Sequence, residues 1–430
     1  MITLQERVHS SPPPTGWSLN KLHRVFRVRK GFKNTGMQED NLLSLSYGRI
    51  IRKSIDAAEG LLPESFETYQ IVEPGNIVMR LTDLQNDKRS LRQGLVKERG
   101  IITSAYDALE LEKGHDPRFW AYALLALDLA KYYYSLGGGV RQSIKFSDFP
   151  NDWISTPNTD TQKAIADFLD REAARIDQLI EKKQRLVGLL RERSLSAIEK
   201  AVTADASLSK LGHHVKILPG YAFASAAFST NDEDIRLLRG ANVSPGKIRW
   251  DDVVYWPRDA IGGLDRFQLE AGDIVMGMDR PWISGGIRVA EITESDLPSL
   301  LLQRVCKIIP VKTLSKEFLK LLLSSKRFLG YFEPELTGVS VPHISGDQIA
   351  GFRFAYLPVS QQEERARACQ KVRKSNDAII ERAQQSMSQL QEFRSALITA
   401  AVTGQIDLAT WGKQGQTDRR LDEIEEAMQA

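Results

Sequence analysis

Two segments of the chain return about two hundred residues later. The stretch from Glu73 to Met79 reappears as the stretch from Glu270 to Met276, with five identities in seven positions at a shift of 197. A longer charged segment repeats at a shift of 200. Its matched pairs include Asp177 with Asp377, Leu190 with Leu390 and Ala201 with Ala401. A chain that carries one globular block and one charged segment twice is expected to form two similar modules with a pseudo-two-fold relationship, which suits a two-sided partner such as duplex DNA.

The repeat divides the chain into blocks. Residues 1–155 alternate short β-rich runs with turns and one helix-like stretch, which predicts an α+β domain. Residues 206–357 repeat this pattern. Residues 156–205 and 358–411 are charged segments in which apolar residues recur at heptad-like intervals, so each predicts one long helix. Their narrow apolar stripes are expected to pack together as an antiparallel pair. Residues 412–430 are predicted to be a polar tail.

Composition narrows the class of protein. The 430 residues are 42% hydrophobic and 26% charged, as in ordinary soluble proteins, and the net charge is only +3. Any nucleic-acid surface must therefore come from local clustering of cations. Cys306 and Cys369 fit neither a disulfide framework nor a zinc cluster, and we expect reduced thiols. The N-terminal residues do not resemble a signal peptide and no run is long enough to span a membrane, so a cytoplasmic location without membrane contact is expected.

Three segments resemble one protein family. The stretch from Thr161 to Ile180 resembles the first conserved helical region of type I restriction-modification specificity subunits. The lead-in from Gly220 to Ser225, with Leu237 to Val243, is similar to the start of that family's target recognition domains. The stretch from Phe393 to Gly404 resembles the end of the second helical region. One departure is that the second helix opens with Gln361, Gln362, Glu363, Glu364 and Arg365, without the Gln-x-x-Ile-x-x-Phe-Leu pattern of the first.

The resemblance implies a fold and a role. The fold would be two pseudo-symmetric α+β target recognition domains separated by two long helices that form an antiparallel coiled coil. Each recognition domain would bind one half of a split target in double-stranded DNA, and the helices would set the gap. The partners would be two copies of a DNA adenine methyltransferase subunit and a restriction/translocase subunit, in a bacterial or archaeal cytoplasm. The chain itself would hold no cofactor, because S-adenosylmethionine and ATP with Mg²⁺ would bind to the partner subunits.

The motifs of the sequence agree with a non-catalytic role. The chain has no Gly-rich dinucleotide loop and no Walker loop. The Pro12 to Pro14 run lacks the aromatic ring with which an adenine methyltransferase grips a flipped base, and Glu181 to Lys183 is interpreted as a solvated helix face rather than part of a nuclease site. Two other classes remain as alternatives. One is a coiled-coil scaffold that binds only proteins, and the other is a hydrolase, for which no constellation of carboxylate, His or Cys residues can be assembled.

The candidate DNA contacts lie in loops of the two α+β blocks. Arg and Lys side chains position a protein on phosphates, and Arg, Gln, Ser or His can bond to base edges. In the first block the candidates are Arg49, Arg52, Lys53, Lys88, Arg89 and Arg92. In the second block they are Arg239, Lys247, Arg249, Arg280, Ser284 and Arg288. The loop before each block closes adds Arg141, Gln142, Ser340 and His343. For any one of them the alternative is ordinary surface charge or, for His343, a structural role.

The long helices also carry candidate partner contacts. A coiled-coil seam buries only about two positions in seven, so apolar residues outside it need another partner. We expect docking of the methyltransferase subunits at four such residues, which are Ile180, Val187, Ile198 and Ile398.

Overall fold

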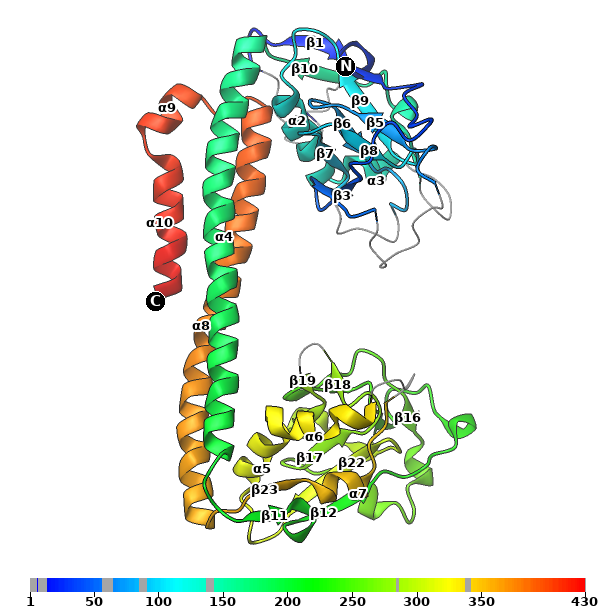
Figure 1. The fold of residues 1–430 in the computed structure, drawn as a ribbon, viewed down its shortest axis with the longest axis vertical. Coiled ribbons are helices and arrows are strands. Elements are labelled where there is room, and N and C mark those ends of the chain that lie inside the picture. Colours follow the sequence, from blue (N-terminus) through cyan, green and yellow to red (C-terminus); the bar gives the residue numbers. More distant parts are fainter. Residues whose placement is uncertain are drawn as a thin grey trace. The chain divides into compact units, whose positions relative to one another are not determined.

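The computed structural model describes residue 6 and residues 14–55, 65–84, 91–136, 143–283, 286–336 and 342–429. The chain divides into two compact units (Figure 1). The first unit contains residues 1–184 and 382–430, and the second contains residues 185–381. The long helices α4 (Thr159–Val202) and α8 (Val359–Val402) contribute one part to each unit. They lie within residues 156–205 and 358–411, each of which is predicted from the sequence to form one long helix, and α8 ends before residue 411.

The first unit is built on an antiparallel sheet with the order β2-β9-β6-β7. Its strands are β2 (Phe26–Val28), β6 (Ile77–Met79), β7 (Gln93–Leu95) and β9 (Asp107–Leu111). Three further pairs are β1 (Ser18–Lys21) with β10 (Trp153–Thr156), β3 (Leu43–Ser46) with β4 (Arg49–Arg52), and β5 (Gln70–Val72) with β8 (Gly100–Ile102). The short helices are η1 (Leu22–Arg24), α2 (Pro117–Leu129), α3 (Tyr132–Leu136) and η2 (Phe146–Asp148). Phe119 and Trp120 of α2 are fully buried in the core of this unit.

The second unit repeats this plan with a sheet of order β12-β22-β17-β20. Its strands are β12 (Val215–Pro219), β17 (Ile274–Gly277), β20 (Val289–Glu291) and β22 (Val305–Pro310). Smaller sheets contain β11 (Leu208–Lys210) with β23 (Arg353–Ala355), β16 (Tyr255–Trp256) with β13 (Ile235–Leu238) and β21 (Ser299–Leu301), β14 (Val243–Ser244) with β15 (Lys247–Ile248), and β18 (Trp282–Ile283) with β19 (Gly286–Ile287). The helices are α5 (Lys316–Leu323), α6 (Lys326–Leu336), α7 (Gly346–Gly351), η3 (Leu211–His213), η4 (Ser225–Ala227), η5 (Arg258–Ala260), η6 (Asp265–Phe267) and η7 (Glu294–Asp296).

The repeated sequence motif forms the same turn and strand in both units. The Glu73 N–H donates to Asn76 Oδ1 at 2.8 Å, and the Glu270 N–H donates to Asp273 Oδ2 at 2.9 Å. The glycine inside each turn has a positive φ, +92° at Gly75 and +94° in the second copy, a conformation that favours a residue without a Cβ. The strands that follow, β6 and β17, are both interior strands of their four-stranded sheets. The predicted duplication of an α+β block is therefore confirmed.

The two long helices pack against each other in an antiparallel sense, as predicted. In the first unit Arg394 Nε of α8 lies 3.0 Å from Asp177 Oδ1 of α4. In the second unit Asn376 Nδ2 donates to Ser194 Oγ at 2.9 Å, and Arg365 donates to the Ala201 carbonyl oxygen at 3.2 Å. Along these three contacts the residue numbers rise in α4 while they fall in α8. The two helices of the coiled coil therefore run in opposite directions.

The segment predicted to be a polar tail is instead largely helical. After α9 (Leu408–Lys413), helix α10 (Gln416–Gln429) packs its apolar side into the core of the first unit through Leu421 and Ile424. Lys183 of α4 forms an ion pair with Glu425 at 2.7 Å. The polar composition misled the prediction because α10 is short and only one of its faces is buried. Among the described residues no helix is both long and apolar enough to cross a membrane.

Candidate nucleic-acid interface

The hairpin formed by β3 and β4 presents the first group of candidate cations. Arg49, Arg52 and Lys53 are all exposed. Two of them already have acidic neighbours, since Arg49 lies 3.2 Å from Asp177 of α4 and Arg52 donates from Nε to Glu98 at 2.7 Å. For Lys53 the described part of the chain records no ion pair. The hairpin can therefore offer Lys53 directly. Its two arginines become available only if DNA phosphates displace the half-buried carboxylates of Asp177 and Glu98.

Arg92 is fully buried, so the prediction that it contacts DNA is wrong, and the half-buried Arg288 also turns to acceptors of its own domain. They hold equivalent places just before β7 and β20. The Arg92 side chain is fully buried and donates to the carbonyl oxygen of Thr82 at 3.1 Å. Arg288 is half-buried and donates to the carbonyl oxygen of Gly240 at 2.7 Å. Because each guanidinium satisfies backbone acceptors of its own domain, the two arginines hold loops together.

The cations of the second unit divide into paired and free ones. Arg239 lies 2.8 Å from the Asp252 carboxylate and donates to the Asp252 carbonyl oxygen at 2.6 Å. These contacts stabilise its own loop. Lys247 and Arg249 are exposed, at and just after the short strand β15. Neither has an ion pair within the residues that the structure describes. They are the better candidates for phosphate contacts.

A compact polar cluster forms where β17 ends. His343 Nδ1 lies 2.6 Å from Asp279 Oδ1, and Arg304 lies 3.2 Å from the same oxygen. The Arg280 N–H donates to the Pro342 carbonyl oxygen at 2.7 Å, and the Arg280 side chain is exposed. The structure thus brings together Arg280 and His343, which the sequence placed in separate loops. Together they offer exposed donors of the kind that recognise base edges.

The loop that precedes the end of the α+β block takes the same course in both units. The Ile144 N–H donates to the Leu81 carbonyl oxygen at 3.0 Å, and the Ile344 N–H donates to the Met278 carbonyl oxygen at 3.0 Å. The closing loop of each block therefore returns to the end of the equivalent central strand. Several candidates in these and neighbouring loops lie outside the described residues. They are Lys88, Arg89, Arg141, Gln142, Ser284 and Ser340.

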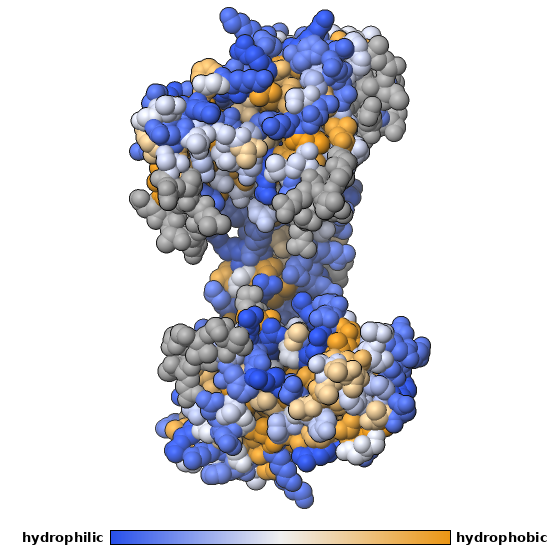
Figure 2. All heavy atoms as spheres, turned by 90° about the vertical axis from the view of Figure 1, so that its right-hand side faces the viewer, coloured by the Kyte–Doolittle hydropathy of each residue, from blue (hydrophilic) through white to orange (hydrophobic). Residues whose placement is uncertain are grey.

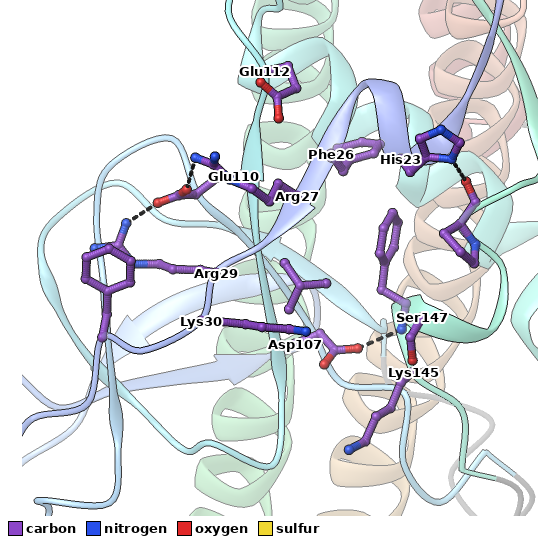
Figure 3. Close-up of a pocket in the computed structure, with 14 residues that line it drawn as sticks. His23, Phe26, Arg27, Arg29, Lys30, Asp107, Glu110, Glu112, Lys145 and Ser147 are labelled. Atoms are coloured by element: carbon purple, nitrogen blue, oxygen red, sulfur yellow. Dashed lines mark hydrogen bonds and ion pairs between the residues drawn. The ribbon is translucent and has the colours of Figure 1, made fainter.

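Sequence reasoning missed a basic segment at the edge strand β2. Residues 21–33 contain six Lys and Arg residues, a local density that the sequence shows plainly. Arg27 and Lys30 are exposed, and with Lys145 they border an open pocket of about 1000 Å³ (Figure 3). Glu110 lies between Arg27 and Arg29 in this pocket. Burial acts to raise the pKa of Glu110, but the hydrogen bonds and charges of these two arginines outweigh it and lower the pKa.

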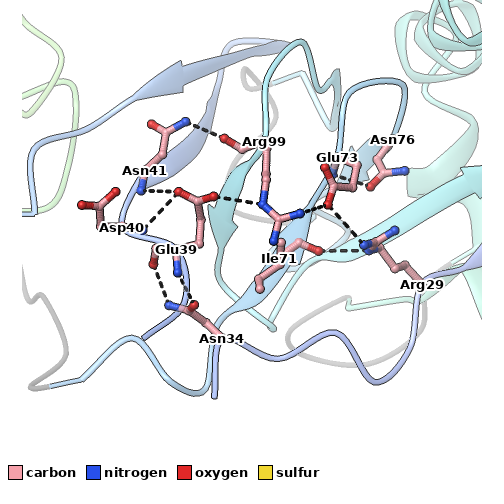
Figure 4. A network of polar contacts seen from close by, with 9 residues as sticks. All are labelled: Arg29, Asn34, Glu39, Asp40, Asn41, Ile71, Glu73, Asn76 and Arg99. Atoms are coloured by element: carbon pink, nitrogen blue, oxygen red, sulfur yellow. Dashed lines mark hydrogen bonds and ion pairs between the residues drawn. The ribbon is translucent and has the colours of Figure 1, made fainter. Parts of the chain in front are cut away.

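Part of the positive charge of this segment is neutralised by acidic residues of the same unit. Arg29 donates to the Ile71 carbonyl oxygen at 3.0 Å and lies near Glu73 (Figure 4). Arg99 joins Glu73 to Glu39, with a distance of 3.1 Å to the latter carboxylate. This network ties β5 to the loops around it, so Arg29 and Arg99 are structural. Hydrophilic side chains spread over the faces of both units that Figure 2 shows, between smaller hydrophobic patches.

The four residues expected to dock methyltransferase subunits are buried within the chain, which corrects that prediction. Ile180 and Ile398 belong to the core of the first unit and Ile198 to the core of the second, and Val187 is also buried. Helix α10 is one cause, because it covers α4 near Ile180 through the Lys183–Glu425 ion pair. The large hydrophobic residues of α4 that are exposed are Leu189 at 58% and Leu195 at 41%.

The described residues contain no group of three or more His, Cys, Asp or Glu side chains that could hold a metal ion. Cys306 and Cys369 are free thiols, and both are buried. Complete burial raises the pKa of the Cys306 thiol to about 12, so this residue is a poor nucleophile at neutral pH.

Comparisons with known proteins agree with this picture. No protein-family profile matches the chain. The MjaVIII type I restriction enzyme specificity subunit of Methanocaldococcus jannaschii is 25% identical over 425 residues, covering 93% of this chain and 95% of that protein. The EcoAI type I restriction enzyme specificity subunit of Escherichia coli is 41% identical over 155 residues, which are 36% of this chain but only 26% of that relative.

A solved structure supports the fold. It was described in a study of complex assembly and conformational transition of the type I R-M system, and its chain superposes with a TM-score of 0.68 at 12% identity, covering 92% of this chain and 100% of that one. At this identity the likeness concerns the fold. Over nearly its whole length the chain is similar in sequence to a type I restriction enzyme specificity subunit, and it shares its fold with a chain from a study of the type I R-M system.

Proposed function

We propose that the chain is the sequence-specific DNA-binding subunit of a type I restriction-modification complex, in which each α+β block recognises one half of a bipartite target. The observation that carries the proposal is the duplication of one α+β block within a chain related to specificity subunits along 93% of its length. In this proposal the chain is not an enzyme, and it directs adenine methylation and restriction that partner subunits perform.

The exposed cations have distinct roles in this proposal. Lys53 of the first block and Lys247 and Arg249 of the second would contact phosphates, which position the protein without selecting a sequence. Arg280 and His343 would recognise base edges from the end of β17, where Asp279 fixes the His343 ring. The candidates outside the described residues, among them Gln142 and Ser340, remain proposals for the same task.

The proposed partners are double-stranded DNA, two copies of a DNA adenine methyltransferase subunit and a restriction/translocase subunit. S-adenosylmethionine, ATP and Mg²⁺ would bind to those partners. Two methyltransferase copies would match the pseudo-two-fold repeat of the chain. We also propose the domain limits of the sequence, with recognition domains at residues 1–155 and 206–357.

A methyl-transfer assay with labelled S-adenosylmethionine tests the proposal. The full chain, its methyltransferase and the mixture are each incubated with a library of duplex DNA, and the methylated adenines are sequenced. Only the mixture should methylate, and at one split sequence. Methylation by the isolated chain would contradict the proposal. Methylation at sites that do not depend on the chain would favour the alternative, a coiled-coil scaffold without DNA recognition.

A further inference from the structure

Both units have a crevice in the same place, between the recognition block and the long helix that follows it in sequence. In the first unit the crevice has a volume of about 420 Å³ and lies between α2, β7 and α4. In the second it has a volume of about 640 Å³ and lies between α5, β20 and α8. Four helix positions line both crevices at a shift of 200. They are Asp170 and Gln370, Ala173 and Arg373, Ala174 and Lys374, and Asp177 and Asp377.

The charges of the two crevices differ. In the first, α4 contributes Asp170, whose carboxylate accepts hydrogen bonds from Arg118 at 3.0 Å and Tyr122 at 2.9 Å, so the acidic group is already satisfied. In the second, α8 contributes cations. Those that line the crevice from α8 are Arg367, Lys371, Arg373 and Lys374.

The acidic groups around the second crevice do not neutralise these cations. Glu291 is occupied by Lys316 at 2.5 Å and Lys320 at 2.7 Å. Arg367 has Glu363 at 3.7 Å, one turn before it on α8. For Lys371, Arg373 and Lys374 the part of the chain that the structure describes records no ion pair, although Asp377 also lines the crevice.

We propose that this basic crevice of the second unit, formed by Lys371, Arg373 and Lys374 of α8, binds the phosphate backbone of duplex DNA. The inference rests on the proposed function and deepens it. Lys371 and Lys374 are exposed and three positions apart, so they lie on one face of the helix, about 5–6 Å from each other, where both can contact one strand of phosphates. The crevice is continuous with the turn between β14 and β15, since Gly246 lines it and is followed by the candidate phosphate contact Lys247.

The lining favours DNA over a protein partner. Among the described residues that line the crevice, the aliphatic ones are Val289 and Ala290, and none is aromatic. Protein interfaces are enriched in aromatic residues and depleted of Lys at their centre, whereas phosphate contacts need long cationic side chains. The first crevice is lined by cations as well, but α4 contributes none of them. Arg49 and Arg394 there are paired with Asp177 and Arg118 with Asp116, so the proposal concerns the second crevice.

The test compares two triple variants of the full chain that lose the same charge. In the crevice variant Lys371, Arg373 and Lys374 are changed to Ala. In the control variant Arg191, Arg193 and Lys200 of α4, which are exposed in the same unit, are changed to Ala. Fluorescence anisotropy measures binding to a 40-base-pair duplex of arbitrary sequence at several salt concentrations.

We expect the slope of log Kd against log salt to fall by roughly two to three for the crevice variant, with affinity weakened about tenfold or more. The control variant should stay close to the wild-type chain. Equal slopes for the crevice variant and the control would overturn the crevice assignment while leaving the proposed function intact. A crevice variant that binds DNA normally but no longer co-purifies with its methyltransferase would assign the crevice to a protein partner. A wild-type chain that binds no DNA with or without that methyltransferase would overturn the proposed function itself.

Discussion

Gln162 and Gln362 lie 200 residues apart and use their buried amides in the same way. Gln162 Oε1 accepts the Asp116 N–H at 2.9 Å, and Gln362 Oε1 accepts the Ser315 N–H at 2.8 Å. Each Nε2 donates to the carbonyl oxygen five residues earlier, at 2.9 and 2.7 Å. Asp116 and Ser315 are the N-caps of α2 and α5. One glutamine therefore joins the start of each long helix to the N-terminus of α2 or α5 in the α+β block that precedes it.

Replacing either glutamine should loosen that junction. Gln162→Leu or Gln362→Leu leaves a backbone N–H and a carbonyl oxygen buried without partners, which should lower the free energy of unfolding of that unit by about 1–3 kcal/mol. Gln361→Leu is the matched control, because Gln361 is exposed. Urea unfolding followed by tryptophan fluorescence checks the difference. Equal stabilities of Gln362→Leu and Gln361→Leu would contradict the structural role.

The sequence predicted the repeated elements well because their signals are local. The turn from Glu73 to Asn76 needs a glycine with positive φ and an Asx side chain, and both features are visible in its two copies. The long helices show heptad periodicity over 44 residues each. The second helix starts at Val359 even though the motif of the first is incomplete there. Arg365 stands where the first helix has Ile165. It donates to the carbonyl oxygen of Thr203 at 2.8 Å, just beyond the end of α4. A cation is favourable there because the C-terminus of a helix carries partial negative charge.

The site residues were harder to predict because exposure depends on distant parts of the chain. Arg92 resembles any other arginine in a polar loop, yet Thr82 and Tyr134 bind its guanidinium. Ile180 lies outside a simple seam, but α10 arrives from the far end of the sequence to cover that side of α4. Such contacts have no periodic signature in one sequence. The basic segment around Arg27, by contrast, is visible in the sequence as six Lys and Arg residues within residues 21–33.

Inward and outward arginines should give different phenotypes. Arg288→Ala removes a donor to the Gly240 carbonyl oxygen and should lower the stability of the second unit by about 1–3 kcal/mol without changing which sequence is methylated. Arg280→Ala should leave stability within about 0.5 kcal/mol and weaken or broaden the choice of bases in one half of the target. Thermal unfolding and sequencing of methylated sites separate the two. An unchanged target for Arg280→Ala would remove that residue from the interface.

Asp128 provides a prediction for pH. Burial raises the pKa of this carboxyl to about 6, although it accepts the Arg92 N–H at 2.6 Å. The folded state therefore binds more protons than the unfolded state between about pH 4 and 6, and stability should fall as pH rises through that window. Asp128→Asn keeps the acceptor and removes the charge, so it should stabilise the chain at pH 7 by at most about 3 kcal/mol. Denaturation at pH 4.5 and pH 7 checks this, and an equal effect at both values would contradict it.

The exposed leucines of α4 replace the buried isoleucines as candidates for partner docking. Leu189→Asp with Leu195→Asp should weaken co-purification with the methyltransferase subunit while leaving the unfolding transition almost unchanged, because both side chains are exposed. Ile180→Asp is the contrasting variant, since it places a charge in the core of the first unit and should destabilise it by several kcal/mol. Normal complex formation by the double leucine variant would show that this face of α4 is not used.

The most direct test of the account is an exchange of one recognition block. Residues 1–155 are replaced by the matching block of a related specificity subunit, and the methylated adenines are mapped by sequencing in cells that also express the methyltransferase. Because each block is proposed to recognise one half of the target, one half of the methylated sequence should change and the other half should stay the same. A change in both halves together, or in neither, would contradict the two-block account.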